Sequence, residues 1–394
     1  MVLAFVGWGF AQAFLPIGSS PELAIPSVDA SLERLATISV SPSRTIAVSS
    51  FFLSHVLFAY LVFGFVDRRD RGVQLVRFCG IVGLIYAAYG FTVFVSGNET
   101  VLWYEKWTGH ESLTSSFVNR NSYAAYAGLG LQCLVAYAFY WTQAELAENR
   151  TGRELYRHLL ETMLQKAWWL PIAILLTATA VILTNSRAGF VSVALGVFVL
   201  FLLSPNRYQR SANWGKRVAA YSTGLAIAAG LFYLSGQTLD TRLQKDTSAD
   251  RRFINYPHVV EAIEDRPLLG YGLGAFDPVH LTYRSPDEPG WFSRAHSDYL
   301  ELAHTAGIPA AVWFLMALGI AIVFLVRRLV FGLQYRAFIA LGITTSLQLA
   351  IHSTVDFSLQ MPAVSYLWVA ILAVSLAIAH RCELAQKRDN PGLG

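Results

Sequence analysis

The sequence predicts an all-α fold: a polytopic bundle of transmembrane helices that forms a single membrane domain over residues 1–394. Hydrophobic residues make up 54% of the chain and charged residues only 14%, whereas soluble globular domains carry about 25% charge. Long apolar runs recur along the chain, and a helix of about 20 residues covers the roughly 30 Å hydrocarbon core of a bilayer. These observations exclude an ordinary soluble enzyme.

Nine apolar runs approach the length of a membrane span, so about nine to ten spans are expected. The runs are residues 46–66, 73–95, 122–142, 168–184, 188–203, 218–234, 306–326, 338–351 and 363–378. Residues 1–15 are also apolar, but they lack the basic start and the small-residue cleavage motif of a signal peptide. We expect them to belong to a further helix.

Basic residues indicate how the spans are oriented. Most Lys and Arg residues lie in alternate connections between the apolar runs and in the tail, residues 379–394. The positive-inside rule assigns these parts to the cytoplasm, including an amphipathic segment at 143–167. The long polar loop at 235–305 then lies on the opposite side, and we expect it to be partly helical. Because the net charge is only +4 and the basic residues mark topology, no nucleic-acid partner is expected.

The end of this loop contains His296, with Asp298 two residues later. Histidine titrates near neutral pH and can accept a proton from a hydroxyl group. We therefore predict that His296 is a catalytic base and that Asp298 is its supporting carboxylate. The alternative is a structural histidine. If the whole stretch is helical, His304 would share a face with His296, because eight residues make about two turns.

Arg187 and Arg120 are candidate anion-binding residues. Arg187 lies in a tight turn between two apolar runs, where an arginine usually pairs with an anion or faces water. The alternative is an anchor that reaches the membrane surface. Arg120 directly precedes another span, between two asparagines, where the alternative is a surface charge beside a helix cap.

A second pair of arginines, Arg251 and Arg252, begins a predicted amphipathic helix in the long loop. Its apolar side would consist of Val259, Val260 and Ile263. The following glycine-rich stretch, residues 270–275, formally fits a dinucleotide-binding fingerprint, but that motif needs a preceding strand in a βαβ unit. We instead expect these glycines to let the backbone pack closely against a glycan or the membrane.

Further polar and aromatic residues occur in the same non-cytoplasmic segments. His352 and Asp356 are four residues apart, which on a helix would put them on one face as a hydrogen-bonded pair; the alternative is that they cap the span. A cationic field suited to a phosphate or diphosphate would comprise Arg120, Arg187, Arg251, Arg252, Arg266 and Arg294. Aromatic residues that suit sugar stacking or membrane anchoring are Trp103, Tyr104, Trp107, Tyr271, Tyr283, Trp291 and Tyr299.

Metal and hydrolase chemistry are not indicated. The His and Asp residues lack the spacings of common metal sites, and no nucleophile-elbow motif surrounds a serine. The three cysteines have no paired spacing. We therefore expect no metal, no cofactor and no disulfide framework.

The ordered motifs resemble the bacterial O-antigen ligase and polymerase superfamily of membrane glycosyltransferases. They are FVNRN at 117–121, NSRAG at 185–189, PLLGYGLGAF at 267–276 with Arg252 upstream of it, AHSDYLEL at 295–302 and HSTVDF at 352–357. Each motif is loose by itself. Their order and their common side of the membrane make the resemblance specific.

The resemblance implies transfer of a glycan from an undecaprenyl-diphosphate carrier to an acceptor hydroxyl, at the periplasmic face of the bacterial inner membrane. The acceptor would be a growing glycan, a lipid A core or a protein. His296 would match the histidine that activates the acceptor, and Arg187 and Arg252 would match the arginines that hold the diphosphate. Arg120 and Arg251 would assist them, and His352, Asp356, Arg266 and Arg294 would support the site.

Three alternatives remain open from sequence. A transporter or flippase for a lipid-linked glycan would use the arginines for binding only, although transporters often show internal repeats and charged groups near the midplane. No repeat is visible here, and the polar residues gather at one face, which favours the enzyme. A protein O-oligosaccharyltransferase would differ only in its acceptor. A structural partner of a polysaccharide export complex would not need His296.

Overall fold

A computed structural model of the chain describes most of the predicted helical regions. The described residues are 1–16, 37–146, 161–163, 165–204, 247–284, 292–331 and 334–389, with a few isolated positions between 157 and 230. Several predictions therefore lie outside them: the span at 218–234, most of the segment at 143–167, the first part of the loop at 235–305, Trp291 and residues 390–394. The side chains of Arg251 and Arg252 also lie outside the described part.

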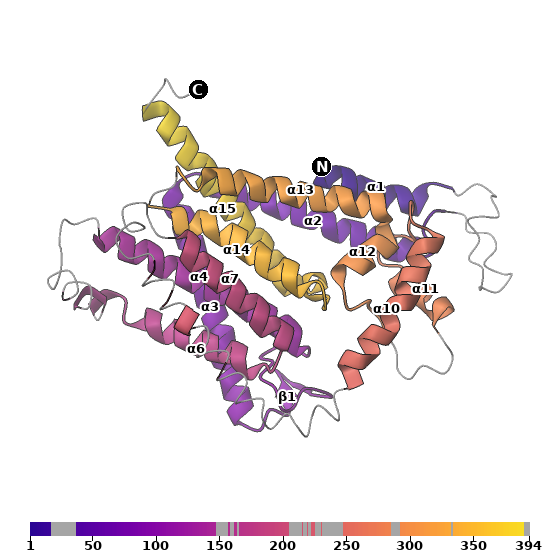
Figure 1. Cartoon of the computed structure of the whole chain (residues 1–394), viewed down its shortest axis with the longest axis horizontal. Helices are drawn as coiled ribbons and strands as arrows, with labels where there is room; N and C mark the ends of the chain where they lie inside the picture. The colour runs from indigo at the N-terminus through magenta and orange to yellow at the C-terminus, as the bar shows by residue number, and fades with distance from the viewer. Residues whose placement is uncertain are drawn as a thin grey trace. The chain divides into compact units, whose positions relative to one another are not determined.

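The prediction of an all-α, polytopic helical fold is confirmed. Helices dominate the described residues, whose only strands are a two-residue antiparallel pair, β1 (Thr100–Val101) and β2 (Tyr104–Glu105). The arrangement of helices is drawn in Figure 1. Within the part of the chain that the structure describes, four helices are long and apolar enough to cross a membrane: α2 (Pro42–Phe65), α3 (Arg69–Val95), α13 (Ile308–Arg328) and α15 (Pro362–Asp389).

The other predicted spans form helices that are shorter or less apolar. Three short apolar helices are α1 (Val2–Phe14), α6 (Trp169–Leu183) and α7 (Arg187–Leu203). Helices α4 (Arg120–Leu146) and α14 (Arg336–His352) cover two predicted spans without reaching the hydropathy of a span. The physical reason is that they carry polar side chains bonded to each other: buried Gln132 of α4 donates to Gln348 of α14 at 2.7 Å.

The chain divides into two compact units. Unit 1 comprises Met1–Phe58, Leu239–Ala321 and Ser353–Gln360, and unit 2 comprises Ala59–Thr238, Ile322–His352 and Met361–Gly394. In unit 2, α14 packs against α4, α7 and α15, while α3 packs against α4 and α6. Helices α3 and α4 approach closely at Gly83 and Gly130, where a Cβ on Gly83 would lie 2.9 Å from the Gly130 Cα.

Unit 1 combines α1, α2 and α13 with three helices from the long loop: α10 (Thr247–Asp265), α11 (Phe276–Tyr283) and α12 (Asp298–Ala306). Aromatic side chains join the apolar helices, since the Phe5 ring lies 5.3 Å from the Phe52 ring and 4.7 Å from the Phe314 ring. The amphipathic helix predicted after Arg252 is α10. Val259 and Ile263 are buried as expected, but Val260 is 41% exposed, so its assignment to the apolar side was wrong.

The glycine-rich stretch before α11 is a tightly held turn. The Tyr271 amide donates to the His304 carbonyl at 3.1 Å, and the Gly272 amide donates to the Thr305 carbonyl at 2.9 Å. Gly270 has a φ of 63°, and a Cβ there would lie 2.5 Å from the Gly307 amide nitrogen. The glycines therefore serve close backbone packing, and their neighbour is the end of α12, not the glycan or membrane that the sequence predicted.

One buried residue fixes this turn to the first helix. Gln12 is fully buried, and its side-chain amide donates to the backbone carbonyls of Leu269 and Thr305 at 2.7 and 3.0 Å. Its carbonyl oxygen accepts from the Leu273 amide at 3.2 Å. A glutamine in an apolar helix therefore satisfies three backbone groups of the loop.

Candidate functional site

His296 lies in a strained position at the start of α12. Its φ is 55°, a left-handed conformation that residues other than glycine adopt at a cost and that often marks functional sites. The backbone is held there, because the Tyr256 hydroxyl donates to the His296 carbonyl at 3.0 Å. Phe292 and Phe357 approach the imidazole edge-on, with ring centroids 5.9 and 5.0 Å away.

Asp298 begins α12 and joins it to the segment that carries Phe357. Its carboxylate accepts from the Ser353 hydroxyl at 2.8 Å and from the Gln360 side-chain amide at 3.1 Å. Its backbone amide donates to the Ser353 carbonyl at 3.0 Å. Burial raises the pKa of Asp298 to about 7. The role of this carboxylate in orienting the His296 imidazole stays a prediction, since its hydrogen bonds described here go to Ser353 and Gln360.

The two residues before His296 are held by Glu301. One carboxylate oxygen of Glu301 accepts from the Arg294 guanidinium at 3.1 Å, and the other accepts from the Ala295 amide at 2.9 Å. Glu301 is buried, and this burial raises its pKa. Arg294 therefore forms an ion pair inside unit 1, which the prediction of an open cationic field did not anticipate.

His304 plays a packing role. Helix α12 starts at Asp298, so His296 precedes it and the predicted shared helical face does not exist. The His304 ring is buried and stacks on Tyr271, with centroids 4.9 Å apart. Burial lowers the pKa of His304 to about 3, so the ring stays neutral near neutral pH.

Arg266 and two tyrosines form a second buried cluster. The Arg266 guanidinium is 4.9 Å from the Tyr271 ring centroid, and its Nη2 donates to the Ile38 carbonyl at 3.4 Å. The Tyr283 hydroxyl donates to Asp265 at 2.6 Å and lies 2.7 Å from the Tyr271 hydroxyl. Burial lowers the pKa of Arg266. Because Tyr271 is only 1% exposed, its predicted availability for sugar stacking was wrong.

Arg187 is the first residue of α7 and is exposed. Asn185 before it has a φ of 53°, and the Ser186 hydroxyl caps the helix by accepting from the Gly189 amide at 3.1 Å. The same hydroxyl donates to the Asn121 side chain at 2.8 Å. Because Asn121 follows Arg120 at the start of α4, the two motifs that carry Arg120 and Arg187 meet in unit 2.

The prediction that His352 and Asp356 share a helical face was wrong. Helix α14 ends at His352, and the chain then turns. Asp356 instead caps the next turn, because one carboxylate oxygen accepts from the Phe357 amide at 2.8 Å and from the Ser358 hydroxyl at 3.1 Å. That turn leads into a short 3-10 helix, η4 (Ser358–Gln360).

The predicted site residues thus fall into two groups. Arg251, Arg252, Arg266, Arg294, His296, Asp298 and Asp356 belong to unit 1, and Arg120, Arg187 and His352 belong to unit 2. The residues that sequence reasoning missed are Tyr256, Glu301, Ser353 and Gln360. Glu301 belongs to the AHSDYLEL motif at 295–302. Its partners are the Ala295 backbone amide and the Arg294 guanidinium, which the turn before α12 brings close to it.

Comparison with known protein families assigns the central part of the chain. Residues 172–315 match the family model described as O-antigen ligase. The chain is similar to O-antigen ligases over this region, which is called the O-antigen ligase domain below. The domain contains, among the predicted site residues, Arg187, Arg251, Arg252, Arg266, Arg294, His296 and Asp298. No curated protein matches the chain. Together with the apolar helices, the domain indicates a multi-pass membrane glycosyltransferase of the O-antigen ligase or polymerase type.

Proposed function

We propose that the chain transfers a glycan from undecaprenyl diphosphate to an acceptor hydroxyl at the periplasmic face of the bacterial inner membrane. The observation that carries the proposal is the backbone conformation of His296, which lies inside the O-antigen ligase domain and has a φ of 55°. Backbone strain of this kind costs of order 1–3 kcal/mol, and it persists where the surrounding structure enforces it.

The reaction follows from a base and a good leaving group. The His296 imidazole accepts the proton of the acceptor hydroxyl as the hydroxyl oxygen attacks the anomeric carbon of the donor sugar. The bond from that carbon to the diphosphate oxygen breaks, and the electron pair leaves with the diphosphate. Attack from the face opposite the leaving group inverts the anomeric carbon. A positioned base of this kind contributes typically 10²- to 10⁴-fold to the rate.

Positive charge on the diphosphate completes the mechanism. Arg187 and Arg252 would bind the diphosphate oxygens and stabilise the charge that develops on the leaving group. Arg251, next to Arg252 in sequence, and Arg120, next to the Asn121 that bonds to Ser186, would assist them. Asp298 acts as a positioning residue in this proposal, because its carboxylate holds the segment whose Phe357 ring contacts His296. A metal ion is not needed for this chemistry.

The proposal is tested with purified protein, an undecaprenyl-diphosphate-linked repeat unit and three acceptors offered separately. Chain growth identifies a polymerase, transfer to lipid A core a ligase, and transfer to a protein serine a protein glycosylation enzyme. We expect transfer to one acceptor, and its loss in His296→Ala with donor binding retained. The matched control is His110→Ala, because His110 is an exposed histidine in another loop. Wild-type turnover by His296→Ala would refute the base, and no transfer to any acceptor would refute the activity.

A further inference from the structure

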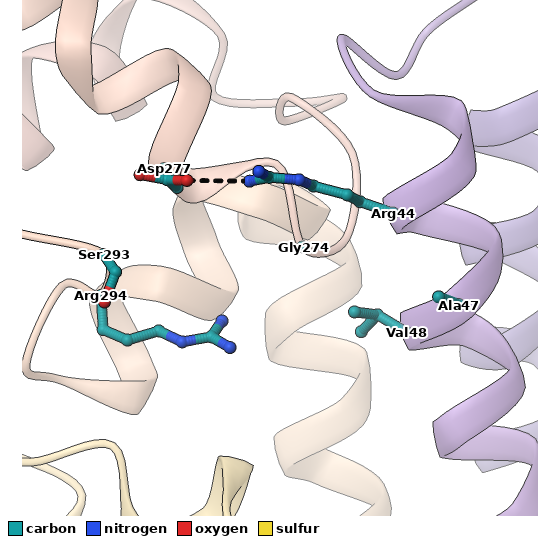
Figure 2. A pocket seen from close by; sticks show the side chains of 7 residues that line it. All are labelled: Arg44, Ala47, Val48, Gly274, Asp277, Ser293 and Arg294. Carbon is teal, nitrogen blue, oxygen red and sulfur yellow. Dashed lines mark hydrogen bonds and ion pairs between the residues drawn. The ribbon is translucent and has the colours of Figure 1, made fainter.

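A pocket of about 290 Å³ lies beside the start of α2, within unit 1. Its polar walls are Arg44 of α2, Asp277 of α11, Ser293 and Arg294 (Figure 2). Arg44 lies outside the family match and Asp277 lies inside it, and neither was among the predicted site residues. Arg294, which also lines the pocket, was predicted to support the site.

The charges that line the pocket are balanced. Arg44 forms an ion pair with Asp277 at 3.0 Å, and Arg294 forms one with Glu301 at 3.1 Å. Each guanidinium thus already has an acidic partner, so a ligand with its own negative charge would compete with a carboxylate. The second carboxylate oxygen of Asp277 is buried and has no hydrogen-bond partner among the described residues, so this carboxylate retains an unsatisfied acceptor. This pattern favours an uncharged, polyhydroxylated ligand over an anion.

One side of the pocket is apolar. Ala47 and Val48 of α2 face Gly274, whose φ is 79°. A Cβ on Gly274 would lie 2.7 Å from the Val48 Cγ2, so the glycine lets the turn approach the helix. In Figure 2, Asp277 faces Arg44, and the Arg294 guanidinium points toward the side of the pocket that carries Val48. An apolar floor with hydrogen-bonding walls suits a pyranose, which has C–H faces and hydroxyl edges.

The pocket is linked to His296 through the backbone. Arg294 is two residues before His296, so their Cα atoms are at most about 7 Å apart. Glu301 holds both Arg294 and the intervening Ala295 amide. The pocket therefore lies beside the backbone that carries His296.

We propose that this pocket binds an uncharged sugar residue of the glycan acceptor, next to the residue whose hydroxyl reacts. The inference rests on the proposed function for the role of His296. Asp277 and Arg44 accept and donate hydrogen bonds at the sugar hydroxyls, and Ala47 packs against a ring face. The pocket then contributes to acceptor selection and leaves diphosphate binding to other residues.

The test uses the full chain in lipid nanodiscs and ligand-observed saturation-transfer NMR. The probes are methyl glycosides of neutral hexoses, with the methyl glycoside of a hexuronic acid for comparison. We expect signals from at least one neutral glycoside, reduced at least fivefold by Ala47→Phe, which fills the pocket from an exposed position, and by Asp277→Asn. Ser50→Phe adds the same ring at an exposed position of α2 outside the pocket, and it should leave the signals unchanged.

Several results would overturn the inference. They are an absence of neutral-glycoside signals with the wild-type protein, unchanged signals in both pocket variants, and binding of the hexuronate alone. A transfer assay separates this failure from failure of the proposed function. If the wild-type protein transfers glycan and both pocket variants keep its acceptor KM, the pocket assignment is wrong and the activity stands. The NMR measurement needs no turnover, so it decides the pocket even when the activity is refuted.

Discussion

The residue before the N-cap of α7 and the residue before the N-cap of α12 have the same left-handed backbone conformation, but they differ in residue type. A residue with positive φ precedes a capping serine at both starts, Asn185 (53°) before α7 and His296 (55°) before α12. Asparagine adopts this conformation with local hydrogen bonds, and the Asn185 side-chain amide donates to the Glu111 backbone carbonyl at 3.1 Å. The turn before α7 is therefore structural. Before α12, the strained residue is itself the one with useful chemistry.

The two helices also differ in the charge of their first residue, which is Arg187 in α7 and Asp298 in α12. A helix N-terminus carries partial positive charge, which favours Asp298 and disfavours Arg187. Asp298 is half-buried and bonded to Ser353 and Gln360, whereas Arg187 is exposed. Helix α7 therefore exposes the charge of its first residue, whereas α12 bonds the charge of its first residue to Ser353 and Gln360.

The largest expected effect comes from placing glycine at both strained positions. Glycine adopts a positive φ without cost, so His296→Gly and Asn185→Gly should both fold. We expect His296→Gly to lose at least about 100-fold in transfer rate, because the base is gone, and Asn185→Gly to stay within about twofold. Transfer assays and thermal unfolding of both variants check this. Equal losses in the two variants would remove the proposed distinction between the turns.

A smaller effect is expected at Arg187. Arg187→Ala should raise the KM for the lipid-diphosphate donor at least about tenfold, and Arg187→Lys should restore part of it, since lysine keeps the charge without the planar fork. The KM for the acceptor should not change. Arg68→Ala, at an exposed helix start with no proposed role, is the control. An unchanged donor KM in Arg187→Ala would exclude this residue from the donor site.

Asp298 should make stability depend on pH. Because burial raises its pKa from 3.8 to about 7, the folded state keeps a proton that the unfolded state has lost between these values. This contribution to stability is full below about pH 4 and is lost as pH rises through 7. We expect the melting temperature of the wild-type protein to fall, relative to Asp298→Asn, between pH 5 and pH 8. A constant difference between the two proteins would contradict the raised pKa.

The smallest effects concern the caps. Ser186 makes two well-formed hydrogen bonds, at 2.8 and 3.1 Å, whereas the Ser297 hydroxyl accepts from the Leu300 amide at 3.5 Å. We expect Ser186→Ala to lower the free energy of unfolding by about 1–2 kcal/mol and Ser297→Ala by less than about 1 kcal/mol. Chemical denaturation in detergent measures both. The reverse order would show that the α12 cap is the stronger one.

Hydropathy predicted the fold class and the position of most described helices, because apolar length is a local property of the chain. The search for long apolar runs overestimated the apolar character of α4 and α14, which contain the buried Gln132 and Gln348 that bond to each other inside unit 2. Hydropathy also gave no indication that Gln12 bonds to three backbone groups of the loop. Such pairings join residues that are far apart in sequence.

The candidate site was predictable in its residue types and less so in its contacts. Asp298 was expected to support His296 because it is two residues away, but its described partners arrive from Ser353 and Gln360. His352 and Asp356 were paired on helical spacing, and α14 ends before that spacing applies. In both cases a helix boundary changed the geometry, and boundaries are the part of a pattern that sequence defines least well.

Chemical rescue of His296→Gly tests the proposed base most directly. The variant keeps the backbone conformation and opens space where the imidazole was, so added imidazole can take over the proton transfer. We predict that imidazole raises the transfer rate of His296→Gly at least about fivefold, with a pH dependence that follows the free imidazole, and leaves Arg187→Ala unchanged. A His296→Gly variant that transfers glycan at the wild-type rate without imidazole would contradict a base at this position.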